Sequence, residues 1–196
     1  MKKLILFFFL LTVTISFSQK MKVLEGDFKN LKEIKNYYVV FDYKDVMIPD
    51  FDSEEDFLKD KMLKREKKET GAGEVFKKSW LSDRENKYHP EFIDAFNFHG
   101  KKKGLHVSEN SDDNFIMKVH TLTIYPGYNV GIVSKASYVD TEISIYKKEY
   151  PDTLLLKVLY PKSYGSTAYN AGDRIARCYN TLAIDVLRSI KKKALK

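Results

Sequence analysis

The four histidines are the side chains best suited to bind a metal ion or to move a proton near neutral pH. They occupy positions His89, His99, His106 and His120. Two ligands share one helical face only when they lie one turn apart, and no two of these histidines have that spacing. The sequence therefore predicts surface or half-buried histidines, with no metal site and no cofactor.

Five carboxylates lie between Asp50 and Asp56, and they superficially resemble a calcium-binding loop. The glycine that such a loop needs for its sharp turn is missing, and so is the glutamate at its twelfth position. Ser53 is a favourable N-cap residue, and carboxylates in the first turn of a helix offset the helix dipole. We interpret these acidic residues as the start of a helix.

Nucleophilic side chains lack the surroundings that would activate them. The chain contains no Gly-x-Ser-x-Gly motif, which marks the exposed serine of many hydrolases. Cys178 falls on the apolar stripe of the last predicted helix, where a thiol acts as a small core residue. The segment Gly71-Ala72-Gly73 follows a helical pattern, whereas a phosphate-binding loop places its glycines between a strand and a helix. The sequence therefore predicts no catalytic residue.

An enzyme with hydrolase-like chemistry stays open as an alternative, because scattered polar residues can meet in a fold. Its first candidates are Arg84, His120, Asp140 and Glu142. A pocket that holds two of them with shifted pKa values would favour this alternative. A third class is a carrier of an apolar ligand, which requires an internal cavity lined by the sheet.

Two surfaces are candidates for binding a partner. The first is the loop Tyr125–Gly131, in which Tyr125, Tyr128 and Asn129 accompany a proline and two glycines. Tyrosine offers a large contact area at low entropy cost and is enriched in binding loops. The alternative for this loop is a long hairpin whose aromatic side chains are packed.

The second candidate surface is the pair Trp80 and Arg84, one helical turn apart. A guanidinium over an indole ring is either simple cation–π packing or the rim of a binding groove. The favoured interpretation is a non-enzymatic protein that binds an envelope protein or a glycan through the Tyr125–Gly131 loop, the edge of its sheet and this pair. An edge strand offers unpaired backbone groups to an incoming strand.

Residues 1–18 predict a cleavable signal peptide. Two lysines stand near its start, an almost unbroken apolar run covers residues 4–13, and Ser16 and Ser18 place cleavage before Gln19. A spanning helix needs about 20 apolar residues, roughly twice the length of this run, so an uncleaved anchor is the weaker alternative. We therefore expect an exported protein, periplasmic or secreted, without a stable membrane span after cleavage.

The composition after cleavage indicates one domain, residues 19–196. Removal of 18 of the 196 residues lowers the net charge from +7 to +5, because Lys2 and Lys3 are lost. The remaining lysines alternate with acidic residues along the chain, which argues against a nucleic-acid partner. A single cysteine cannot form an internal disulfide, and a chain of this length can bury a sufficient core without one.

Periodicity predicts the elements that would position these residues. Helices are expected from Ser53, over residues 74–87, from Pro90 onward and over residues 175–190. Strands are expected over residues 37–43, 105–108, 115–125, 136–146 and 153–160.

This order predicts an α+β fold: a mostly antiparallel sheet of four to five strands with helices packed on one face. A long helical segment follows the first strand, and an amphipathic helix ends the chain. Pro126 and Gly127 end the strand predicted over residues 115–125, because that pair suits a type II turn.

Several short motifs span nearly the whole chain after the signal peptide: Ser53–Phe57, Gly71-Ala72-Gly73, Trp80 with Asp83-Arg84, Tyr88–Phe92, Tyr125–Gly131 and Arg174–Arg177. In this order they resemble an uncharacterised family of secreted proteins from Bacteroidetes. More distantly, the strands and last helix are similar to the periplasmic domain of the curli-secretion lipoprotein and related envelope-assembly proteins. The chain departs from that group because it lacks the lipidated cysteine and any pore-forming hairpin. The resemblance implies an envelope or secreted location and no catalytic residue.

Overall fold

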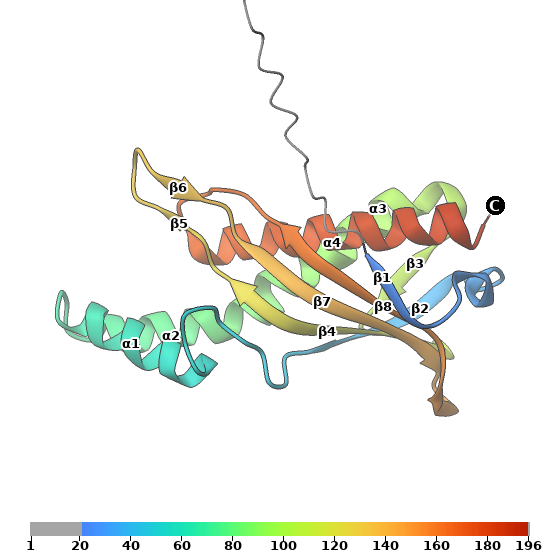
Figure 1. Cartoon of the computed structure of the whole chain (residues 1–196), viewed down its shortest axis with the longest axis horizontal. Coiled ribbons are helices and arrows are strands. Elements are labelled where there is room, and N and C mark those ends of the chain that lie inside the picture. The colour runs from blue at the N-terminus through green and yellow to red at the C-terminus, as the bar shows by residue number, and fades with distance from the viewer. Residues whose placement is uncertain (1–20, 196) are drawn as a thin grey trace, which may run out of the picture.

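The computed structural model describes residues 21–195, so the predicted signal peptide lies outside the described residues (Figure 1). Six strands form one sheet in the order β1-β8-β7-β4-β2-β3. Their bounds are β1 (Lys22–Gly26), β2 (Asn36–Asp42), β3 (His106–Ser108), β4 (Phe115–Tyr125), β7 (Tyr138–Lys147) and β8 (Tyr150–Tyr164). A separate hairpin consists of β5 (Tyr128–Asn129) and β6 (Ser134–Lys135).

The α+β class is confirmed, but the sheet differs from the prediction in size and type. It has six strands rather than four or five, and it is mixed, because β2 runs parallel to both β3 and β4. The missed strand, β1, lies at the edge and all five of its residues are exposed, so no alternation marks it in the sequence. The parallel pairing arises because all the helices between β2 and β4 form one long crossover connection.

Four long helices accompany the sheet: α1 (Glu54–Glu66), α2 (Ala72–Asp83), α3 (His89–Gly100) and α4 (Ala171–Lys193). The shorter ones are η1 (Phe28–Leu31), the π-helical turn η2 (Arg84–Tyr88) and η3 (Lys101–Lys103). Within the described residues, no helix combines the length and the apolar character needed to cross a membrane.

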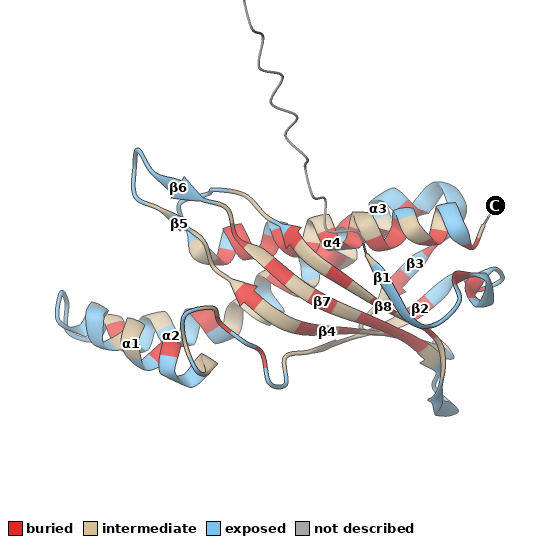
Figure 2. Ribbon diagram, in the orientation of Figure 1, coloured by how far each residue is buried: buried red, intermediate tan, exposed pale blue. Residues whose placement is uncertain are grey.

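The helices α3 and α4 lie side by side on one face of the sheet (Figures 1 and 2). The apolar stripe predicted for the last helix is buried, from Ile175 through Cys178 to Ile190. The Tyr179 and Thr121 hydroxyls, 2.7 Å apart, form a hydrogen bond between α4 and β4. This face therefore forms the hydrophobic core of the molecule.

The helices α1 and α2 form a hairpin that extends beyond the sheet (Figure 1). Ser53 caps α1 as predicted, since its hydroxyl accepts a hydrogen bond from the backbone N–H of Asp56 at 3.0 Å. At the turn, the Glu66 carboxylate accepts hydrogen bonds from the backbone N–H groups of Gly71 and Gly73. Gly71 has a φ of 85°, so the break between the two helices needs a residue without a Cβ.

Candidate binding site

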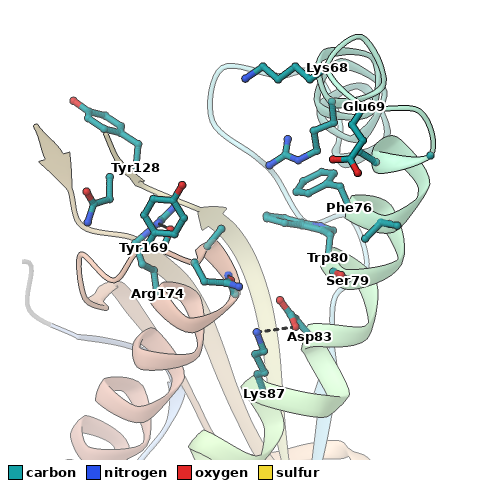
Figure 3. A pocket seen from close by; sticks show the side chains of 18 of the residues that line it. Lys68, Glu69, Phe76, Ser79, Trp80, Asp83, Lys87, Tyr128, Tyr169 and Arg174 are labelled. Carbon is teal, nitrogen blue, oxygen red and sulfur yellow. Dashed lines mark hydrogen bonds and ion pairs between the residues drawn. The ribbon is translucent and has the colours of Figure 1, made fainter. Parts of the chain in front are cut away.

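A surface groove of about 860 Å³ separates the α1–α2 hairpin from β5 and the start of α4 (Figure 3). Its walls come from segments that are far apart in the sequence. One wall consists of residues of α1, α2 and η2 together with the turn between α1 and α2. The other consists of Tyr128, Asn129 and Arg174 with residues 169–172.

The α2 wall presents one face of a helix. Phe76, Ser79, Trp80 and Asp83 occupy positions i, i+3, i+4 and i+7, which places them on the same side of α2. The Trp80 residue is only 4% exposed, so it forms the base of the wall. The Arg65 guanidinium of α1 lies over the Phe76 ring, 3.9 Å from its centroid. The wall is therefore aromatic with a cation above it.

Trp80 and Arg84 are joined through a carboxylate rather than by direct stacking. The indole Nε1 of Trp80 donates to Glu54 Oε1 at 2.6 Å, and Arg84 Nη2 donates to Glu54 Oε2 at 2.7 Å. The Arg84 guanidinium lies over the Tyr43 ring, 4.4 Å from its centroid. Arg84 does not line the groove; it supports the wall from behind.

The opposite wall carries two accessible tyrosines. Tyr128 is 41% exposed and Tyr169 is 87% exposed. Asn129 has a structural role beside them, because its amide Nδ2 donates to the Thr167 carbonyl at 2.6 Å. Its Oδ1 accepts a hydrogen bond from the Gly131 backbone. The Asn129 amide therefore fixes the β5–β6 hairpin against the segment before α4, and Tyr128 is positioned as a result.

Arg174 holds this wall together. From the sequence it was singled out only as the first residue of the Arg174–Arg177 motif, and no structural role was predicted for it. It is 5% exposed, and burial lowers the pKa of its guanidinium. Its nitrogens donate to the carbonyl oxygens of Pro126, Gly127, Ala168 and Tyr169. It therefore ties the turn after β4 to the loop before α4. An arginine in the first turn of a helix, where acidic residues are favoured, was the available signal.

An ion-pair network closes one end of the groove. Lys87 Nζ lies 3.2 Å from Asp83 Oδ1 and 2.9 Å from Asp173 Oδ1, which links the end of α2 to α4. Desolvation opposes the charged form of Lys87, but the hydrogen bonds to Asp173 and Asp83 raise its pKa overall. Gly172 allows the Asp83 carboxylate to lie this close to α4, because a Cβ on residue 172 would lie 1.9 Å from Asp83 Oδ2.

The groove unites the two surfaces that the sequence treated separately. Trp80 lies on one wall, and Tyr128 and Asn129 lie on the other (Figure 3). Tyr125 lies outside the groove, stacked on the Tyr138 ring with 5.0 Å between centroids. The residues that sequence reasoning missed are Phe76, Tyr169 and Arg174, which become neighbours of the predicted ones only through the fold.

The four candidates for an enzyme are not gathered in the groove. His120 and Glu142 are cross-strand partners on β4 and β7, and Glu142 Oε1 lies 2.9 Å from Lys157 Nζ. The Asp140 carboxylate accepts a hydrogen bond from the Lys162 backbone at 2.7 Å. Arg84 is bound to Glu54 as described above, and His120 Nε2 lies 3.1 Å from the Lys44 carbonyl oxygen. Each of the four side chains therefore has a structural partner.

A half-buried histidine lies at the start of α3. The ring of His89 stacks on Phe41 with 3.9 Å between centroids, and Nδ1 lies 2.9 Å from Glu109 Oε1. Burial, with the nearby Arg84 charge, lowers the pKa of His89 to about 4. The ring is therefore neutral at neutral pH, and its contact with Glu109 is a hydrogen bond rather than an ion pair. Within residues 21–195, no three His, Cys, Asp or Glu side chains are grouped to hold a metal ion.

Comparisons of this chain with protein-family models, curated proteins and solved structures found no match. The resemblance to secreted proteins of Bacteroidetes and to envelope-assembly proteins stays a prediction.

Proposed function

We propose that this protein is an exported, non-enzymatic binding module of the cell envelope or its surroundings, and that the groove holds its partner. The observation that carries this proposal is the pair of aromatic walls. Phe76 and Trp80 face Tyr128 and Tyr169 across the groove (Figure 3). Concave sites with aromatic linings and a few polar groups are the usual form of a binding site.

The polar groups of the groove favour binding over catalysis. Asp83 and Lys87 neutralise each other, and Arg174 is engaged by backbone carbonyls. Cys178 is buried in α4, and burial raises the pKa of its thiol to about 12, so it stays protonated near neutral pH. Cys178 does not line the groove, and Asp83, Lys87 and Arg174 shape it rather than supply a nucleophile with its base.

The accessible rings indicate the chemistry of the partner. Tyr128 and Tyr169 present flat apolar faces with hydroxyl groups that can donate and accept hydrogen bonds. At the mouth, the Arg65 and Lys68 side chains add positive charge beside Glu69. A glycan or an extended segment of an envelope protein combines flat apolar faces with hydrogen-bonding groups, and either would suit these walls.

Crosslinking in the native cell envelope tests the proposal. The bait is the chain from Gln19 onward, compared with the double variant Tyr128→Ala, Tyr169→Ala. The matched control is Tyr150→Ala, because Tyr150 is 55% exposed at the start of β8 and does not line the groove. We expect a discrete partner that the control retains and the double variant loses, while both keep the same thermal midpoint.

Glycan and peptide arrays probed with the same three proteins identify the partner class. If all three capture the same set in both experiments, the groove is not the binding site. Catalysis on the outer face of the sheet, where His120 and Glu142 are neighbours, or transport of an apolar ligand would then be the better proposal.

A further inference from the structure

The turn between β5 and β6 exposes three aliphatic side chains. Val130 is 69% exposed, Ile132 is fully exposed at 102%, and Val133 is 49% exposed. The turn is closed by a hydrogen bond from the Val130 N–H to the Val133 carbonyl at 3.0 Å. Figures 1 and 2 show this hairpin projecting from the body of the molecule with its tip exposed. We call residues 130–133 the hairpin tip.

The folding of the hairpin does not require this apolar tip. Gly131 adopts a φ of 84° and its N–H is bound by the Asn129 side chain, so these two residues define the turn. Turns of this kind normally carry polar residues, which keep the exposed segment in water. Ile132 contributes a side chain that is wholly in solvent. Its apolar character therefore points to a contact outside the chain.

A collar of tyrosines and lysines surrounds the base of the hairpin. Tyr125, Tyr138 and Tyr164 are cross-strand partners in one row, where β4 and β7 lead into the hairpin. Lys135 Nζ lies 4.9 Å from the centroid of the Tyr125 ring, and Lys162 Nζ lies 5.5 Å from that of Tyr138. No acidic residue occurs between Pro126 and Val139. The hairpin thus combines an aliphatic tip with an aromatic and cationic base.

We infer that the hairpin tip inserts into a membrane that carries anionic lipids, while the collar contacts the headgroups. Tyrosine rings favour the interface between water and the apolar layer, and lysines reach the phosphates above it. The hairpin itself contains no acidic residue, and Lys135 and Lys162 bring two positive charges to its base. The nearby carboxylate of Asp140 accepts the Lys162 backbone N–H. The collar therefore keeps an excess of positive charge, which complements anionic headgroups. The inference is independent of the groove, although both use the β5–β6 hairpin.

A lipid surface fits this tip better than a protein does. A stable protein interface buries about 800 Å² on each partner. Three side chains on a narrow projecting turn offer much less, and they present no flat surface for a partner to cover. A bilayer needs no complementary pocket, so a small apolar tip with a charged base is sufficient for reversible binding.

Vesicle sedimentation tests this inference. The chain from Gln19 onward contains every described residue of the core, and it is mixed with vesicles of phosphatidylcholine alone or with added phosphatidylglycerol. We expect binding that rises with phosphatidylglycerol. The variant Val130→Asp, Ile132→Asp should weaken it about tenfold or more. The variant Lys135→Glu, Lys162→Glu should remove the dependence on phosphatidylglycerol.

The control is Phe98→Asp, because Phe98 is 79% exposed on α3 and belongs to neither the tip nor the collar. It should bind vesicles like the unaltered chain. Trp fluorescence of an Ile132→Trp variant gives an independent measurement, since insertion shifts the emission of a tip indole to shorter wavelength. Equal binding by the tip and control variants overturns the inference. So does absence of vesicle binding, including the case in which the tip variant instead loses a crosslinked protein.

Discussion

The Glu54 carboxylate binds the Arg84 guanidinium through both of its oxygens, with Arg84 Nη2 2.7 Å from Oε2, and both side chains are only 19% exposed. Glu54 is the first residue of α1, and Arg84 begins the π-helical turn after α2. One ion pair therefore fixes the start of one helix of the hairpin to the end of the other. It also holds Trp80, whose indole donates to the same carboxylate.

Replacement of Glu54 by Gln should destabilise the protein by about 1–3 kcal/mol, because it leaves the Arg84 charge half-buried without a counter-ion. Urea unfolding followed by circular dichroism measures the change. Glu55→Gln is the matched control, since Glu55 is 78% exposed in its pair with Lys59 and should shift stability by less than about 0.5 kcal/mol. Equal losses of stability in the two variants would show that the Glu54–Arg84 pair stabilises the protein no more than an exposed ion pair does.

Replacement of Arg174 by Met should cost about 2–4 kcal/mol, because four backbone carbonyl oxygens lose their donor. The loss of stability should be largest near residue 174 as well as measurable for the whole protein. Hydrogen exchange should accelerate most in the segment before α4 and in the turn after β4. Arg177→Met serves as control, because the Arg177 side chain is 59% exposed on the same helix. Uniform acceleration across the whole chain would argue against a clamp at this site.

The stability of the protein should fall as the pH drops from about 6.5 to about 4. The pKa of His89 is lowered from 6.5 to about 4 by burial, so the unfolded chain binds a proton in this window that the folded chain does not. The loss attributable to His89 is about 2–3 kcal/mol at the lower end of this window.

The variant His89→Phe removes this titration and keeps an aromatic ring against Phe41. Thermal midpoints measured across the window should therefore depend less on pH in the variant. His106→Gln is the control, because His106 is exposed on β3. A pH dependence that is unchanged in His89→Phe would mean that other groups, such as Asp42, whose pKa the hydrogen bond from Lys118 lowers, dominate the response.

Replacement of Gly172 by Ala should separate the end of α2 from the start of α4. The added Cβ would lie 1.9 Å from Asp83 Oδ2 and 3.0 Å from Lys87 Nζ, so the ion-pair network must move. We expect a destabilisation of about 1–3 kcal/mol and weaker capture of the partner. Ala at Gly104 is a comparison without steric conflict, because only the positive φ of 65° opposes it. Unchanged binding in Gly172→Ala would show that this end of the groove does not contact the partner.

Hydrophobic periodicity and capping residues in the sequence predicted several strands, helix starts and buried faces correctly. The strand expected over residues 115–125 is β4 with the same bounds, and Ser53 caps α1. On β7, the face that carries Val139, Thr141 and Ile143 is buried as the alternation predicted. The last helix buries the expected stripe. These features could be predicted because side-chain period and capping act over a few residues.

The groove could be predicted only in fragments. The sequence singled out Trp80 and Tyr128 by residue type, yet nothing in their spacing shows that they face each other across one groove. The roles of Arg174 as a clamp and Glu54 as a shared acceptor depend on carbonyl and indole groups that the chain brings near only after folding. The types of the residues identified candidates for a binding site, but only their contacts in the folded protein show what each residue does.

The sequence by itself determined the class of fold, the buried faces of the central strands and the stripe of the last helix, because these follow from short-range periodicity. The tertiary structure alone decided the parallel pairing of β2 with β4, the inclusion of the exposed edge strand β1 and the placement of α2 and β5 on opposite walls of one groove. These depend on crossover direction, strand order and packing between distant segments, and such long-range choices leave no local pattern for a single sequence to display.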